Sequence, residues 1–140
     1  MIVDLESDSF PDLLEVDLCV IGAGPAGMAI ALRLADAPIS IAVLESGGLN
    51  PEQPTQDLAR GEASGISYSL EGTRLRVFGG TTRHWEGMSL PLCPIDFEKR
   101  DWVPRSGWPF GVSELDAYWR DAHLFVGLGA LRDGEPLPSI

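Results

Sequence analysis

The chain has 140 residues, of which 44% are hydrophobic and 22% charged, a composition typical of one globular domain rather than a disordered chain. Its formal net charge of −11 opposes approach to phosphate-rich surfaces, so nucleic acid and anionic membranes are disfavoured as partners and a small molecule is expected. The N-terminus is acidic rather than basic, and no apolar stretch reaches the roughly 18 residues of a membrane span, so we expect a cytoplasmic protein.

An acidic extension, residues 1–15, precedes a predicted strand over residues 16–21 and a glycine-rich turn that opens a helix. Gly22 allows the tight bend, Gly24 lets the backbone approach a pyrophosphate, and Gly27 lets the helix lie close to the strand. The first N–H groups of the helix lack partners within it and lie at the positive end of its dipole, which favours a phosphate. The residues expected to hold the pyrophosphate are Gly22, Ala23, Gly24, Pro25, Ala26 and Gly27.

The residues around this turn favour a helix packed on a sheet. Pro25 suits the first helical turn, where its missing N–H has no cost. Gly27, Ile30, Ala31 and Leu34 follow the spacing of one helical face, and we expect that face to pack on the strands.

A second strand, predicted over residues 41–44, ends in Glu45, which lies 18 residues after Gly27. That spacing is close to the roughly 20 residues expected for the acid that accepts hydrogen bonds from the adenosine ribose. The alternative is a surface glutamate at the end of a strand. Ser46, which we also expect at the cofactor, and two glycines follow instead of a basic residue, so a 2′-phosphate would be repelled and NADP is disfavoured.

The two cysteines have neither the spacing of metal ligands nor a disulfide framework. Cys19 lies in the first predicted strand, and we expect it to be a small buried apolar side chain. Cys93 lies in a proline-flanked loop with no helix start expected nearby, which favours an unreactive thiol.

Residues 46–112 are rich in glycine and proline, and a connection of that length is unusual unless a cofactor or another part of the protein orders it. Two strand-like pieces, residues 67–70 and 74–78, predict a hairpin around Glu71, Gly72 and Thr73.

A closing helix is predicted with Ser113 as its N-cap and Asp116 three residues later. One face of it carries apolar residues: Leu115, Tyr118, Trp119, Ala122 and Val126. Residues 127–140 then offer no further element. Two parallel strands are fewer than a dinucleotide-binding sheet needs, so we expect the N-terminal part of a larger domain; the alternative is a self-contained small domain.

A second motif follows the hairpin region, and its residues are Gly79, Gly80, Thr81, Thr82, His84 and Trp85. Together with the first glycine turn and the later stretch 106–110, this motif resembles the glucose-methanol-choline oxidoreductases. The resemblance is greatest to their bacterial sugar and polyol dehydrogenases and to pyranose oxidase. It extends from about residue 16 to residue 127.

The resemblance implies an α/β fold: a partial Rossmann-like FAD/NAD(P)-binding domain over residues 16–140, beginning with a βαβ unit. By the same resemblance, a long glycine- and proline-rich segment would cover the cofactor, a helix would close the domain, and the substrate domain is expected to lie outside this sequence. It further implies FAD as cofactor and oxidation of an alcohol or sugar hydroxyl by hydride transfer. Residues 79–85 would lie beside the isoalloxazine, where paired glycines permit close approach, the threonine hydroxyls can donate hydrogen bonds and Trp85 offers packing area.

His84 has three open roles: covalent attachment of the flavin, as at the matching place in pyranose oxidase, noncovalent contact with it, or a structural role.

The catalytic base of the family lies downstream of every residue present, so no catalytic residue is assigned. Two other functions remain open. One is a non-catalytic, truncated nucleotide-binding module; the other is a flavin reductase using NADH, which would need a second dinucleotide fingerprint.

Overall fold

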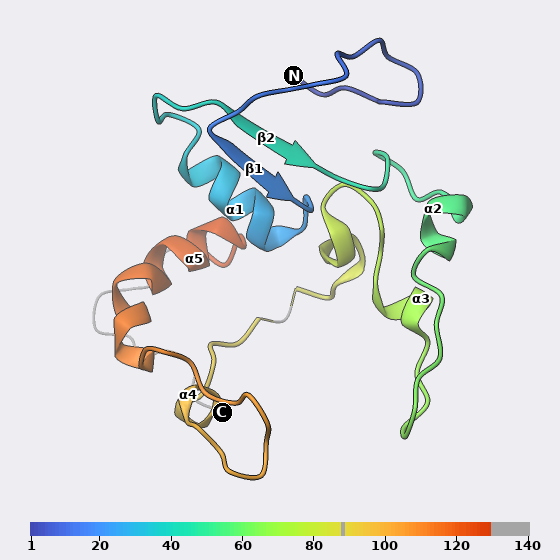
Figure 1. The fold of residues 1–140 in the computed structure, drawn as a ribbon. Helices are drawn as coiled ribbons and strands as arrows, with labels where there is room; N and C mark the ends of the chain where they lie inside the picture. The colour runs from blue at the N-terminus through green and yellow to red at the C-terminus, as the bar shows by residue number, and fades with distance from the viewer. Residues whose placement is uncertain (88, 130–140) are drawn as a thin grey trace. The chain divides into compact units, whose positions relative to one another are not determined.

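A computed structural model describes residues 1–87 and 89–129 of the chain (Figure 1). The chain divides into two compact units, Met1–Glu86 and Gly87–Ile140. Met88 and the end of the C-terminal stretch, residues 130–140, lie outside the described residues. Within the described ranges, no helix has the length and apolar character needed to cross a membrane.

The first unit begins its regular structure with β1 (Leu18–Ile21), α1 (Pro25–Arg33) and β2 (Ile41–Leu44). The strands pair in parallel, with Leu18 opposite Ile41 and Ile21 opposite Leu44. At the start of both strands, the Asp17 carboxylate accepts hydrogen bonds from the backbone N–H and the hydroxyl of Ser40. The predicted βαβ start, strand–turn–helix–strand, is therefore confirmed.

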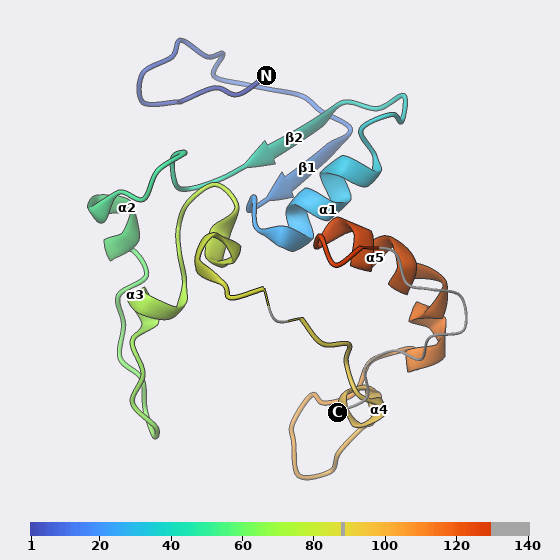
Figure 2. The same ribbon diagram turned by 180° about the vertical axis from the view of Figure 1, so that it is seen from behind.

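Helix α1 packs on one face of this sheet (Figures 1 and 2). Side chains of a strand alternate between the two faces, and Val20, which lies against α1 next to Gly27, is only 8% exposed. Ile30, expected on the packed face of the helix, is 47% exposed, so that part of the prediction is wrong: a sheet of two strands is too narrow to cover the whole helical face.

The other face of the sheet carries Cys19 and Ile21. Ile21 is 87% exposed and Cys19 is also exposed, so the prediction that Cys19 is buried is wrong. The reason is the alternation of the strand: Cys19 points away from α1, where the N-terminal extension covers the sheet only in part. A hollow of about 390 Å³ lies between that extension and the sheet, lined by Phe10, Leu14, Cys19 and Leu44 among others.

After β2 the first unit continues through three short helical pieces: α2 (Gln53–Asp57), α3 (Leu70–Thr73) and the 3₁₀ helix η1 (Gly80–His84). The hairpin predicted around Glu71, Gly72 and Thr73 is wrong, because α3 occupies its turn and residues 67–69 and 74–78 form no strand. The Ser69 hydroxyl accepts a hydrogen bond from the Gly72 N–H at 2.9 Å. This N-cap stabilises a helical turn at the place where a hairpin turn was expected.

The second unit contains α4 (Pro94–Phe97), the 3₁₀ helix η2 (Val112–Tyr118) and α5 (Trp119–Phe125). The rings of Phe97 and Phe110 lie 6.0 Å apart at their centroids, and Phe97 is buried. Cys93 directly precedes α4, which corrects the expectation that no helix begins near it.

The closing helix begins differently from the prediction. Gly111, not Ser113, precedes its first turn, because the Glu114 carboxylate accepts a hydrogen bond from the Gly111 N–H at 3.2 Å. The segment is also divided into a 3₁₀ part and an α-helical part. Of its expected apolar face, Tyr118 and Ala122 are exposed, while the other members are half-buried.

Candidate nucleotide-binding site

The glycine turn between β1 and α1 has the shape of an anion site. Gly22 has a φ of +98°, a conformation that a side chain disfavours, and its N–H donates to the Leu44 carbonyl of β2 at 2.7 Å. Pro25 is the first residue of α1, as predicted, with Gly24 as the N-cap. Among the described residues, none accepts a hydrogen bond from the N–H groups of Gly24, Ala26 or Gly27, so these donors are available to an anion at the start of a nine-residue helix.

The glycines of this turn differ in what surrounds them. A Cβ placed on Gly27 would collide with the Gly22 carbonyl oxygen and lie 3.1 Å from the Val20 side chain. A Cβ placed on Gly24 would meet nothing within 4 Å. Gly27 thus permits the close packing of α1 on β1, whereas the space at Gly24 is open to a ligand.

Glu45, the first residue after β2, binds the glycine turn directly. One carboxylate oxygen accepts a hydrogen bond from the Ala23 N–H at 2.8 Å. The other accepts from the N–H groups of Ser46, at 2.8 Å, and Gly47, at 3.1 Å, and from the Ser46 hydroxyl. Glu45 is thus more than a surface glutamate: it joins the end of β2 to the end of β1.

These contacts set the ionisation of Glu45. Burial acts to raise the pKa of its carboxyl, but the hydrogen bonds from Ala23, Gly47 and Ser46 outweigh burial and hold the pKa below its ordinary value. The side chain is therefore ionised at neutral pH. The oxygen bound to Ala23 keeps a second lone pair, with which it can accept a hydrogen bond from a ribose hydroxyl.

The structure brings the second motif onto the first. The Gly79 N–H donates to the Ala23 carbonyl at 3.0 Å. A Cβ placed on Gly80 would lie 3.3 Å from the Gly24 Cα. Residues 56 positions apart in the chain therefore meet at one turn, and η1 lies beside the carboxyl end of β1 in both views of the fold (Figures 1 and 2).

Two glycines that were not predicted as site residues complete this contact. A Cβ on Gly47 would collide with the carbonyl group of Arg76, and the Gly48 carbonyl accepts a hydrogen bond from the Phe78 N–H at 3.0 Å. Val77, between these two contacts, is 1% exposed. The glycine pair that follows Ser46 was a visible signal for a close backbone approach, although its partner could not be known from the sequence.

The two threonine hydroxyl groups of the second motif differ in whether their protons are free to donate a hydrogen bond to a ligand. The Thr82 hydroxyl donates to the Gly79 carbonyl at 2.5 Å, so its proton is used within the chain. The Thr81 oxygen accepts from the Leu75 N–H at 3.2 Å, which leaves its proton available to a ligand. His84 and Trp85 follow at the end of η1, and both are exposed.

Two curated proteins are similar to the chain. A 6'''-hydroxyparomomycin C oxidase from Streptomyces lividus is 30% identical over 126 residues, which cover 80% of this chain and 23% of the oxidase. A 2-methyl-1,2-propanediol dehydrogenase from Mycolicibacterium austroafricanum is 27% identical over 139 residues, which cover 84% of this chain and 25% of the dehydrogenase. The chain spans about a quarter of the length of these relatives. No protein-family model and no solved structure matches it.

Proposed function

We propose that the chain is the FAD-binding part of an oxidoreductase of the glucose-methanol-choline type. The observation that carries this proposal is the contact between the two glycine motifs, in which Gly79 donates to Ala23 and Gly80 lies against Gly24. A site for a mononucleotide alone would not require the second motif. Two motifs that meet at one turn are suited to one extended ligand that has both a pyrophosphate and a ring system.

The residues divide into two groups along such a ligand. The free N–H groups of Gly24, Ala26 and Gly27 would bind the pyrophosphate, and Glu45 would accept a hydrogen bond from the adenosine ribose. At the other end, Thr81 would donate a hydrogen bond and Trp85 would pack against the isoalloxazine. His84 would lie beside the flavin and is the candidate for covalent attachment.

Bound FAD would supply a two-electron acceptor for a hydride from a carbon that carries a hydroxyl group. The names of the two relatives, which give a hydroxy compound and a diol as substrates, support an alcohol or sugar hydroxyl as the substrate of the complete protein. The residues of this chain bind and orient the cofactor, and none is assigned to proton removal from the substrate.

The test is a titration of the purified chain with FAD and, separately, with ADP. Tryptophan fluorescence of the chain follows both ligands, and visible absorbance also follows FAD. We expect FAD to bind more tightly than ADP, because ADP reaches only the pyrophosphate and ribose groups. Equal affinity for the two would contradict the flavin proposal and favour a nucleotide-binding module. Absence of binding to either would overturn both.

Acid precipitation of the FAD-loaded chain tests the role of His84. Colour that remains in the wild-type pellet but is released to the supernatant by His84→Ala would assign covalent attachment to this histidine. Colour released from both would assign noncovalent contact.

A further inference from the structure

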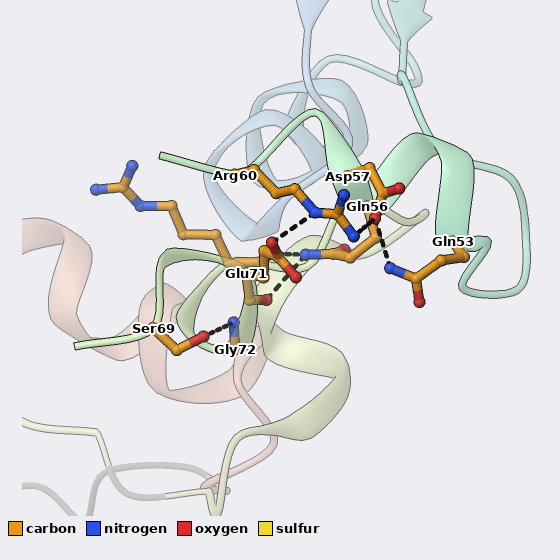
Figure 3. A network of polar contacts seen from close by, with 8 residues as sticks. Gln53, Gln56, Asp57, Arg60, Ser69, Glu71 and Gly72 are labelled. Carbon is orange, nitrogen blue, oxygen red and sulfur yellow. Dashed lines mark hydrogen bonds and ion pairs between the residues drawn. The ribbon is translucent and has the colours of Figure 1, made fainter. Parts of the chain in front are cut away.

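The side chain of Gln56, in α2, is hydrogen-bonded to the backbone of α3 and of the residues that follow it, and Figure 3 shows it beside Glu71. Its NH₂ group donates to the carbonyls of Glu71, at 2.8 Å, and Arg74, at 2.7 Å. Its oxygen accepts from the Arg76 N–H at 3.0 Å. Both ends of this half-buried carboxamide are therefore bonded to backbone that lies 15 to 20 residues further along the chain.

The backbone bonded by Gln56 leads directly into the second glycine motif. Arg76 lies against Gly47, Phe78 donates to the Gly48 carbonyl, and Gly79 donates to the Ala23 carbonyl. Residues 74–78 form no strand, so no sheet ladder holds them. The Gln56 carboxamide takes the place of a neighbouring strand, since it supplies both a donor and an acceptor to this backbone.

The other polar side chains in and just after α2 are less suited to hold residues 74–78. Arg60 forms ion pairs with Asp57 and Glu71, each at 2.9 Å, but its side chain is 61% exposed, and exposed ion pairs contribute little. Gln53 is exposed, and its carboxamide donates to Asp57 within the same helix. Gln56 is thus distinguished by its reach to the segment that precedes Gly79.

We propose that Gln56 is a positioning residue for the flavin end of the site: it holds residues 74–80 so that Gly79 and Gly80 stay against the pyrophosphate turn. The proposal rests on the proposed FAD function. Gln56 need not touch the cofactor, and the adenosine end of the ligand does not depend on it. Its loss should weaken binding of FAD more than binding of ADP.

The experiment compares the wild-type chain with Gln56→Ala and with the matched control Gln53→Ala, each titrated with FAD and with ADP. We expect Gln56→Ala to weaken FAD binding about tenfold, because it removes hydrogen bonds that each contribute modestly, and to change ADP binding less than about twofold. Without any nucleotide, amide hydrogen exchange of a peptide covering residues 74–80 should become faster in Gln56→Ala. Gln53→Ala should resemble the wild type in all three measurements.

A second variant guards against a general loss of structure. Gln56→Glu keeps the length of the side chain and the acceptor for Arg76, but at neutral pH it has no proton to donate to the two carbonyls. We expect weakened FAD binding that recovers, relative to the wild type at the same pH, as acidification protonates the introduced carboxyl and restores one donor.

Three results would decide against Gln56. Equal weakening of FAD and ADP binding would assign it a general structural role, unchanged FAD binding would remove it from the site, and exchange that does not change over residues 74–80 would exclude positioning. Failure of the proposed function would be recognised in the wild type, which would then bind FAD no more tightly than ADP.

Discussion

Alanine substitution at two glycines of the same motif, Gly24 and Gly27, is expected to destabilise the fold to different extents. The turn needs Gly27 because a Cβ there collides with the Gly22 carbonyl, whereas Gly24 has open space. We expect Gly27→Ala to lower the free energy of unfolding by about 1–3 kcal/mol, the range typical of overpacking. Gly24→Ala should cost less than about 1 kcal/mol, the difference between glycine and alanine at an N-cap. Urea unfolding measures both.

The same pair of variants separates folding from binding. Gly24→Ala should bind ADP more weakly than the wild type although it folds, because its Cβ occupies the space open to the ligand. A Gly24→Ala chain that binds ADP normally would show that the pyrophosphate does not approach this residue. A Gly27→Ala chain as stable as the wild type would show that α1 can move off β1.

Glu45 predicts a pH dependence of stability. Its pKa is lower in the folded chain than its ordinary value, so its contribution is fully present above the ordinary pKa and is lost as the pH falls through the folded pKa. We expect Glu45→Gln to lower the free energy of unfolding by about 1–2 kcal/mol at pH 7, since charge-assisted hydrogen bonds to the turn are lost.

The measurement is denaturant unfolding of the wild type and Glu45→Gln from pH 7 downward. The difference between them should shrink as the carboxyl of the folded wild type is protonated. A difference that is constant with pH would mean that the charge of Glu45 does not stabilise the turn.

At the scale of elements, helices and strands could be predicted where the neighbouring residues in the sequence favour them. The β1–α1–β2 start was predictable because a β-branched run, a glycine turn and Pro25 all favour it locally. The hairpin was not, because apolar alternation over residues 67–70 and 74–78 is weaker than the hydrogen bonds that close α3 around Ser69. The start of η2 was also missed, because a glutamate side chain three residues on, rather than a serine, satisfies the first N–H.

Ser69 therefore offers a test of α3. Ser69→Ala removes the acceptor of the Gly72 N–H and should cost about 1 kcal/mol of local stability. We expect faster amide exchange in a peptide that covers α3, with the exchange of β1 and β2 unchanged. Unchanged exchange in α3 would show that its turn does not depend on the cap.

The candidate site was predictable in its residue types but not in its assembly. Gly22, Gly24, Gly27 and Glu45 follow from spacing alone, because the βαβ unit itself brings them together. The contact of Gly79 and Gly80 with that turn depends on backbone approaches at Gly47 and on the carboxamide of Gln56. No local pattern marks a glutamine that bonds to backbone 20 residues away.

At the scale of the first unit, the two faces of the sheet have unequal cover. Parallel sheets are usually buried on both faces, yet here α1 covers one face and the other leaves Ile21 87% and Leu44 48% exposed. The N-terminal extension lies over that face with a hollow between them, which Cys19, Ala42 and Leu44 line from the sheet. Exposed apolar surface of this kind favours association.

Val20 and Ile21, neighbours in β1, allow this asymmetry to be measured with one kind of substitution. Ile21→Thr keeps a β-branched side chain on the uncovered face, so we expect the fold to persist and concentration-dependent association, followed by light scattering, to decrease. Val20→Thr places a hydroxyl on the face covered by α1, where the side chain is 8% exposed, and should lower the free energy of unfolding by about 1–3 kcal/mol. If Ile21→Thr proved as destabilising as Val20→Thr, the second face would be covered in solution; if it left association unchanged, the contact between copies would lie elsewhere on the surface.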